Sequence, residues 1–212
     1  MKELIGNCYV DGNVATGFCD ELEEKLIIPN GTISIKENAF SEYYGVTTID
    51  FPDTLQTIGR AAFHKCSSLR KLNLPKSVIN IEEGYFIGVF SECKQLIEAD
   101  LSETKIKLLN NTFWGCKKLQ KVKLPGTLIK IGKNTFFNCT NLTSLELKEG
   151  LKIIECDFED NIHLSILNIP NSVIHIEDLS NNKNIKTIVI SKYQYEIFKE
   201  YLPAKSKILF KD

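Results

Sequence analysis

The chain has 212 residues, a formal net charge of -1 and 43% hydrophobic residues, which places its composition among ordinary globular proteins. The near-neutral charge argues against a nucleic-acid-binding protein, because such proteins usually carry a basic stripe. No apolar run approaches the roughly 20 residues that are needed to span a bilayer. The composition therefore predicts a folded protein with a sizeable core and no membrane span.

The first 25 residues do not have the character of a secretory signal, because they contain six acidic residues. We therefore expect a cytoplasmic chain, or a mature form if the protein is secreted or displayed on a cell surface. Gly12, Gly17 and the alternation around Tyr9 predict a small β-rich cap at 1–25. Its two cysteines can form a disulfide outside a cell or remain free thiols, and the sequence leaves both states open: Cys8 and Cys19.

A repeat follows, and it is marked by proline. Five of the six prolines occupy the same position in successive repeats, and we call this position the mark of each repeat. The steps between successive marks are 23, 23, 27, 23, 23, 22 and 21 residues. Two apolar residues alternate with a polar one just before each mark, as in Leu72-Asn73-Leu74, and this predicts a short strand with one buried face. The marks are Pro29, Pro52, Pro75, Ser102, Pro125, Lys148, Pro170 and Ser191.

Three more apolar phases recur once per repeat. An isoleucine or leucine follows each mark by six residues, a phenylalanine by eleven and, in three repeats, a cysteine by fourteen. This pattern predicts a solenoid in which each repeat is one coil and equivalent residues stack at a spacing of about 4.8 Å. The residues in these phases are Ile35, Ile58, Ile81, Leu108, Ile131, Ile154 and Ile176; Phe40, Phe63, Phe86, Phe113 and Phe136; Cys66, Cys116 and Cys139.

The run from Ile58 to Pro75 resembles the BspA-like leucine-rich repeat, whose pattern I-G-x-x-A-F-x-x-C-x-x-L-x-x-I-x-I-P is matched over roughly 26–191. The resemblance implies an α/β leucine-rich repeat solenoid of about seven coils, with a curved parallel β-sheet on the concave side and short helical turns and loops on the convex side. It also implies a protein that binds others, often at a cell surface. We predict an N-terminal cap at 1–25, repeats at 26–191 and a C-terminal cap at 192–212.

The 27-residue step comes from a four-residue insertion in segment 84–90, where either Phe86 or Phe90 can occupy the phenylalanine ladder. One interpretation is a longer helix on the convex side that buries both rings. The other is an exposed apolar bulge that a partner binds. The candidate bulge residues are Tyr85, Phe86, Ile87, Val89 and Phe90.

The last twenty residues predict a helix followed by a strand. Five apolar residues recur at helical spacing before Pro203, and a strand is expected at Ile208–Phe210. Three lysines around that strand would discourage edge-to-edge association, so we expect a monomer. The helix residues are Tyr193, Ile197, Phe198, Tyr201 and Leu202, and the lysines are Lys205, Lys207 and Lys211.

The sequence contains none of the common catalytic or phosphate-binding motifs. The three histidines occupy different phases of the repeat, so stacking would not gather them into a ligand set. We interpret the cysteine series as buried, reduced thiols that act as small apolar fillers, and we expect no metal, cofactor or catalytic site. The histidines are His64, His163 and His175, and the cysteines are Cys66, Cys93, Cys116 and Cys139.

The predicted strands also define an outward face. If Leu72 and Leu74 point inward, Lys71 and Asn73 point outward, and neighbouring repeats place charged residues of alternating sign at the same phases. These charges can pair across strands, or they can recognise a mixed-charge protein surface, and both interpretations stay open. The candidate partner-binding residues are Lys71, Asn73, Glu98, Asp100, Lys121, Lys123 and Glu146.

We therefore predict a non-enzymatic protein–protein interaction module that binds a protein partner through this face or through segment 84–90. The alternative is a cell-surface or secreted adhesion protein that contacts host or neighbouring-cell components. A third hypothesis is an enzyme whose site the sequence does not reveal. The partner's identity cannot be inferred from the sequence.

Overall fold

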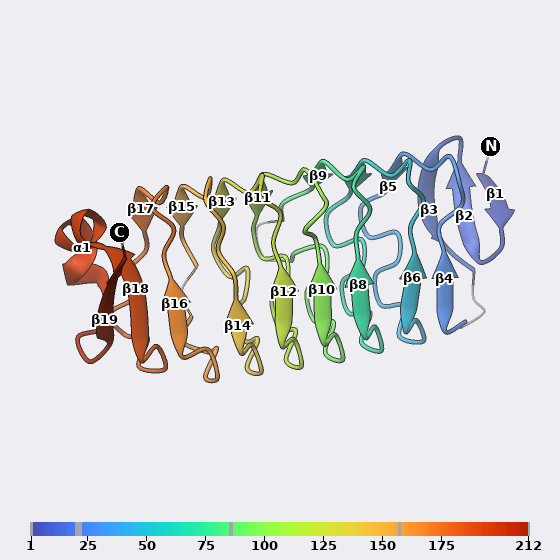
Figure 1. Cartoon of the computed structure of the whole chain (residues 1–212). Coiled ribbons are helices and arrows are strands. Elements are labelled where there is room, and N and C mark those ends of the chain that lie inside the picture. Colours follow the sequence, from blue (N-terminus) through green and yellow to red (C-terminus); the bar gives the residue numbers. More distant parts are fainter. Residues whose placement is uncertain (1, 20–22, 85–86, 157, 212) are drawn as a thin grey trace.

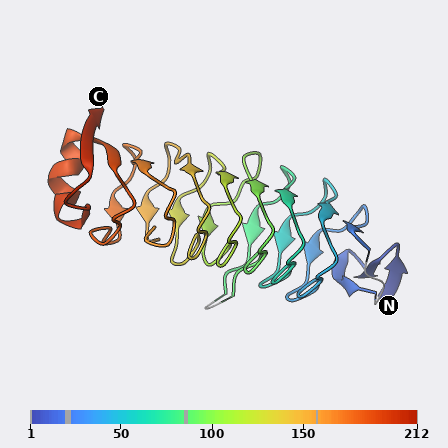
Figure 2. The same cartoon turned by 90° about the horizontal axis from the view of Figure 1, so that it is seen from below.

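The computed structural model describes residues 2–19, 23–84, 87–156 and 158–211. The chain forms a parallel β-solenoid of about eight turns, with its two termini at opposite ends of the stack (Figure 1). Figure 2 shows the coils following one another from the N-terminal cap to the C-terminal cap. The predicted leucine-rich repeat solenoid is confirmed.

One side of the solenoid, here called the sheet face, carries mostly three-residue strands. In most of these strands the middle residue is buried and the outer two are exposed, as the alternation predicts, whereas Ile49 and Asp100 are half-buried. The pairing is parallel, and it is interrupted between β6 and β8 and between β14 and β16. The strands are β4 (Lys25–Ile27), β6 (Thr48–Asp50), β8 (Lys71–Asn73), β10 (Glu98–Asp100), β12 (Lys121–Lys123), β14 (Ser144–Leu145), β16 (Ile166–Asn168), β18 (Thr187–Ser191) and β19 (Lys207–Lys211).

The opposite side, here called the second ladder, carries two-residue strands along the upper edge of Figure 1. An isoleucine or leucine in each strand is buried against the core. In the described residues this side contains turns and strands but no helix, in place of the expected short helical turns. The strands are β5 (Ser34–Ile35), β7 (Thr57–Ile58), β9 (Asn80–Ile81), β11 (Leu108–Leu109), β13 (Lys130–Ile131), β15 (Ile153–Ile154) and β17 (His175–Ile176).

One ladder position differs from the sequence prediction. In β11 the buried residue that aligns with Ile131 is Leu109, whereas Leu108 is exposed. Ser102 replaces proline in this coil, and the following turn closes one residue early through a hydrogen bond from Thr104 N–H to Leu101 C=O. The buried ladder position lies eight residues after Leu101, against seven residues after Leu124 in the next coil, and this extra residue displaces the ladder position by one.

The core is a stack of phenylalanine rings, one from each central coil. Ring centroids of successive coils lie 5.3 to 6.1 Å apart, with interplanar angles between 6° and 15°. At the insertion, Phe90 lies in the stack between Phe63 and Phe113. Of the two phenylalanines in segment 84–90, Phe90 is therefore the one that joins the ladder. The stacked residues are Phe40, Phe63, Phe90, Phe113 and Phe136.

The cysteine series forms a second buried ladder, and its thiols are not merely apolar fillers. Each Sγ donates a hydrogen bond of 3.1 to 3.3 Å to the carbonyl oxygen of the phenylalanine in the preceding coil. Burial raises the pKa values of the Cys93 and Cys139 thiols well above their ordinary range, so both stay protonated donors. The sequence interpretation correctly gave them as free thiols but missed this polar role.

Asparagine takes over from cysteine towards the C-terminus. Asn161 occupies the corresponding turn position, and its Nδ2 donates to the carbonyl oxygens of Phe136 at 2.9 Å and Cys139 at 3.0 Å. In the next coil, Asn184 donates to Phe158 C=O at 3.0 Å. The same carbonyl row is therefore satisfied along the solenoid by two different side chains.

The turns between the two ladders require left-handed backbone at regular positions. Asparagine meets this need in several coils, but Ala61 adopts a φ of 53°. An L-residue other than glycine or asparagine pays about 1–2 kcal/mol in this region. The neighbouring Ala62 is also fully buried and has no positive φ.

We expect Ala61→Gly to be better tolerated than Ala62→Gly by at least about 1 kcal/mol in the free energy of unfolding. Both variants lose one buried methyl group, but only the first relieves left-handed backbone. Urea denaturation of the two variants measures this difference. Equal losses would show that the Ala61 backbone carries no such cost.

The N-terminal cap is an antiparallel meander of β1 (Lys2–Ile5), β2 (Cys8–Asp11) and β3 (Val14–Phe18). The buried Asn7 side chain bonds the outer edge of β4, donating to Lys25 C=O at 2.8 Å and accepting from Ile27 N–H at 3.4 Å. The amide thus takes the place of a neighbouring strand. Cys8 is buried and Cys19 is half-buried, and both are free thiols.

The C-terminal cap contains the predicted helix and strand, as α1 (Lys192–Phe198) with a 3-10 turn (Lys199–Tyr201), and β19. Ser191 caps α1 by accepting from Gln194 N–H. The buried face differs from the expectation: Phe198 and Leu202 are in the core, but Tyr193 is 78% exposed. The core instead receives Gln194, whose Nε2 bonds Pro170 C=O and Val173 C=O, both at 2.8 Å.

Candidate functional site

The predicted binding residues lie together on the sheet face. Strands β8, β10 and β12 align in parallel, so Glu98 sits between Lys71 and Lys121, and Asp100 sits between Asn73 and Lys123. Their middle residues are buried: Leu72, Ala99 and Val122. The alternation of in-pointing and out-pointing residues therefore places these six candidates side by side.

Two of the charge pairs close across strands. Lys123 Nζ lies 2.6 Å from Asp100 Oδ2, and Lys71 Nζ lies 3.7 Å from Glu98 Oε2. Partial burial of Asp100 disfavours its ionised form, but hydrogen bonds from Lys123 and Ser102 outweigh burial and lower the pKa of the carboxyl. Water screens such exposed pairs, so they contribute little to stability. Cross-strand pairing accounts for these four charges.

The sheet face is hollowed in two adjoining places. The first hollow, of about 320 Å³, is lined by all six candidates of β8, β10 and β12. The second, of about 560 Å³, lies over β12, β14 and β16, and it brings in Glu146, the seventh candidate. The residues that line the second hollow are Lys121, Val122, Lys123, Thr143, Ser144, Leu145, Glu146, Leu147, Ser165, Ile166 and Asn168.

The second hollow coincides with the interruption between β14 and β16. In the described part of the chain, β14 pairs with β12 alone on this face, and β16 belongs to a separate sheet with β18 and β19. Lys148 replaces proline after β14, and the next step of the repeat is one residue short. The strand row therefore opens where the repeat departs from its pattern.

Ile166 is the functional candidate that the sequence analysis missed. It is 59% exposed at the rim of the second hollow, and the other coils carry a polar or charged residue at this outward phase. When the repeats are aligned, this outward position is polar in all the other coils, so an isoleucine there indicates an exposed apolar contact. The sequence prediction rests on the buried positions of the repeats, and it does not compare this outward position in the same way.

Two charges of the second hollow differ from the paired ones. Over the described ranges, neither Lys121 nor Glu146 has an oppositely charged group within 4.0 Å. They lie on adjacent strand segments beside the apolar side chains of Leu145 and Ile166. In the described residues, this hollow therefore presents an ammonium group and a carboxylate that have no ion-pair partner, together with an exposed apolar side chain.

The insertion presents less apolar surface than the bulge interpretation requires. Val89 and Phe90 are fully buried, which corrects the interpretation for these two residues, and Ile87 is 38% exposed. Tyr85 and Phe86 lie outside the described residues. The described part of 84–90 contains no helix, so the predicted longer helix is absent there.

At Gly88 a Cβ would clash with the backbone carbonyl oxygen of Asn111, so the chain passes close to the next coil.

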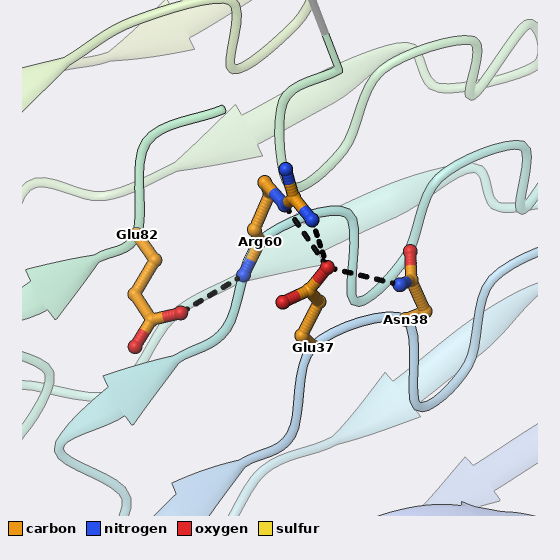
Figure 3. Close-up of polar contacts among 4 residues, drawn as sticks. All are labelled: Glu37, Asn38, Arg60 and Glu82. Carbon is orange, nitrogen blue, oxygen red and sulfur yellow. Dashed lines mark hydrogen bonds and ion pairs between the residues drawn. The ribbon is translucent and has the colours of Figure 1, made fainter. Parts of the chain in front are cut away.

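A polar cluster adjoins the insertion (Figure 3). The Arg60 guanidinium points to Glu37, with Nε 3.1 Å from Oε1, and Asn38 donates to the same oxygen at 3.3 Å. Glu82 accepts the backbone N–H of Arg60 at 3.3 Å. The stem of Arg60 packs beside Gly84, where a Cβ would lie 2.9 Å from its Cδ. These contacts fasten successive coils to each other, and they satisfy the groups involved.

The other titratable groups do not converge. No cluster of three or more histidine, cysteine or acidic side chains suited to a metal ion occurs in the described residues. His64 is buried, with Nδ1 2.8 Å from Ser91 Oγ, and Ser91 Oγ donates to Gly88 C=O at 2.8 Å. The Ser91 hydroxyl is itself fully buried, so this pair secures the insertion to the preceding coil.

His64 should make stability sensitive to mild acid. Burial, reinforced by the Lys65 charge, lowers its pKa below the ordinary value, whereas Ser91, Glu92 and Glu42 act in the opposite direction. The unfolded chain then binds more protons as pH falls, so this contribution to stability is lost towards acid. We expect the free energy of unfolding to fall less between about pH 7.5 and pH 5.5 in His64→Gln. Denaturation curves that keep the same pH dependence would contradict this expectation.

Comparison with known proteins agrees with this geometry. The family model described as "BspA type Leucine rich repeat region (6 copies)" matches residues 15–107 and 87–208. The chain belongs to the BspA-type leucine-rich repeat family. The two matched ranges overlap and together span residues 15–208, which is most of the solenoid. A search of curated proteins finds no match.

Two solved bacterial leucine-rich repeat proteins share the fold of this BspA-type chain. One, from Bacteroides ovatus ATCC 8483, is 19% identical with a TM-score of 0.63, over 89% of this chain and 54% of that chain. Another, from Eubacterium ventriosum ATCC 27560, is 22% identical with a TM-score of 0.69, over 82% and 46%. The chain thus spans about half the length of these proteins. No helix of the described structure is long and apolar enough to cross a membrane.

Proposed function

We propose that this BspA-type repeat chain is a non-enzymatic interaction module that binds a protein partner through the second hollow of the sheet face. The observation that carries the proposal is the grouping of Lys121, Glu146 and the exposed Ile166 around one hollow of about 560 Å³. Repeat solenoids use extended faces of this kind for binding. The paired charges of β8 and β10 extend the same face.

The hollow defines the partner's chemistry. A polypeptide segment that fits it carries an acidic group opposite Lys121, a basic group opposite Glu146 and an apolar side chain against Ile166. Covering the exposed part of the Ile166 side chain would contribute at most about 1.5–3 kcal/mol to binding. The two charges would mainly select the partner and its orientation. The hollow has no aromatic side chain, which disfavours sugar stacking.

A pull-down with matched variants tests the proposal. We expect Ile166→Ser, and separately Lys121→Glu with Glu146→Lys, to lose a partner that the original chain retains. Controls on the second ladder make the same chemical changes: Ile174→Ser, and Lys107→Glu with Glu177→Lys, all at exposed positions. A partner that stays bound to both sheet-face variants would contradict binding at this hollow.

The cellular location of the partner distinguishes the general interaction module from the adhesion protein. The adhesion hypothesis uses the same face but places the partner on another cell. Running the pull-down on a cytosolic fraction and on a cell-surface protein fraction therefore distinguishes them. A partner found only in the surface fraction supports adhesion, and a cytosolic partner opposes it.

A further inference from the structure

The two ends of the solenoid differ in charge. Residues 1–25 contain six acidic residues and two lysines, whereas residues 192–212 contain five lysines and three acidic residues. Two further lysines, Lys183 and Lys186, lie in the turn that precedes β18, close to the C-terminal end. A protein whose net charge is nearly zero thus has an acidic end and a basic end.

The basic end has a hollow of about 400 Å³. It is lined by three lysines around an apolar floor, formed by the turns that precede β18 and β19. Lys186 Nζ bonds Lys183 C=O at 2.7 Å, which holds it at the rim. Among the described residues no carboxylate lines this hollow, and the Asp178 carboxylate accepts the backbone N–H of the lining residue Ser180 at 2.8 Å. Its lining residues are Ser180, Lys183, Ile185, Lys186, Pro203, Ala204 and Lys205.

The acidic end carries its charge at the matching place. Glu23 and Glu24 are exposed in the segment that precedes β4, the first strand of the sheet face. In the solenoid this segment has the same phase as the turns that precede β18 and β19, which line the basic hollow. A second copy stacked along the same axis would therefore bring its Glu23–Glu24 segment to that hollow.

Both ends also expose apolar side chains and an unpaired strand. In the described sheets, β1 is the outermost strand of the sheet that continues into the second ladder, and β19 is the outermost strand of the sheet face, each paired on one side only. Leu4 and Ile5 of β1 are about half exposed, as are Leu209 and Phe210 of β19. We expect the lysines of β19 to oppose pairing between two copies of β19, but they complement an acidic surface.

We propose that the chain associates head to tail with further copies of itself, the acidic N-terminal end of one copy binding the basic hollow at the C-terminal end of the next. Such a contact joins two different surfaces and leaves a free surface at each end, so it produces open chains of copies rather than a closed dimer. This inference is independent of the sheet-face proposal. It differs from the monomer that the edge lysines predict, and the mass of the protein in solution distinguishes the two.

Sedimentation velocity of the full chain tests this contact. At about 20 mM salt we expect the mean mass to rise with protein concentration beyond that of a dimer, and at about 500 mM salt to return towards a monomer. A constant monomer mass at low salt, or a dimer that does not grow, would overturn the proposal.

A charge exchange makes the test specific. Glu23→Lys with Glu24→Lys, and separately Lys183→Glu with Lys205→Glu, should each weaken self-association at least about tenfold. Mixing the two variants should restore it, because each then meets an end of opposite charge, and this recovery also shows that both variants fold. The control Lys107→Glu with Glu177→Lys should associate like the original chain. Association that neither end variant weakens, or no recovery on mixing, would overturn the proposal.

Discussion

Replacing Phe113 with alanine should lower the free energy of unfolding by about 3–5 kcal/mol. The ring is fully buried, and its centroid lies 6.1 Å from that of Phe90 on one side and 6.1 Å from that of Phe136 on the other. Its removal leaves a cavity between coils that depend on each other for burial. Denaturant unfolding of the variant and the original chain measures the loss.

Phe137 provides the matched control. It lies in the adjacent coil next to Phe136, but its ring is 40% exposed and contacts Trp114 at 6.5 Å between centroids. We expect Phe137→Ala to cost less than about 1 kcal/mol, because little cavity forms at the surface. If Phe113→Ala and Phe136→Ala also cost less than that, the stacked ladder does not stabilise the solenoid.

The ladders were predictable because apolar residues recur at constant positions of the repeat, and such positions are buried when coils stack. One phenylalanine per coil at a constant phase requires stacked coils, and the structure places these rings in one row. The insertion shows where this reasoning stops. Two phenylalanines lie four residues apart there, and only the contacts of Phe90 with its neighbours show which one joins the stack.

Polar roles inside the core were less accessible to the sequence. The cysteine phase was recognised, but the hydrogen bond from each thiol to a carbonyl of the preceding coil depends on the stagger between coils. The exposure of Tyr193 and the burial of Gln194 have a related cause. At the end of the solenoid, the carbonyls of Pro170 and Val173 accept hydrogen bonds from the Gln194 amide, and the ring of a tyrosine has no N–H to donate to them.

The candidate site was predictable at its charged residues and not at its centre. Alternation alone places Lys121 and Glu146 outward, and both line the second hollow. The hollow lies where β14 and β16 do not pair, and this interruption is visible only once the coils are stacked. The outward direction of a charged residue follows from alternation within one strand, whereas a gap between two strands depends on how their coils pack together.

The asparagine that continues the cysteine ladder offers a second test of the core. Asn161→Leu should lower the free energy of unfolding by about 1–3 kcal/mol, because the two hydrogen bonds from the amide are lost while the carbonyls of Phe136 and Cys139 keep their backbone N–H donors. Asn161→Cys should cost at least about 1 kcal/mol less, since a thiol at this turn position bonds the phenylalanine carbonyl in the earlier coils. Denaturant unfolding compares the two variants. If leucine is tolerated as well as cysteine, the hydrogen bonds along this row do not hold the coils in register, and apolar packing alone must do so.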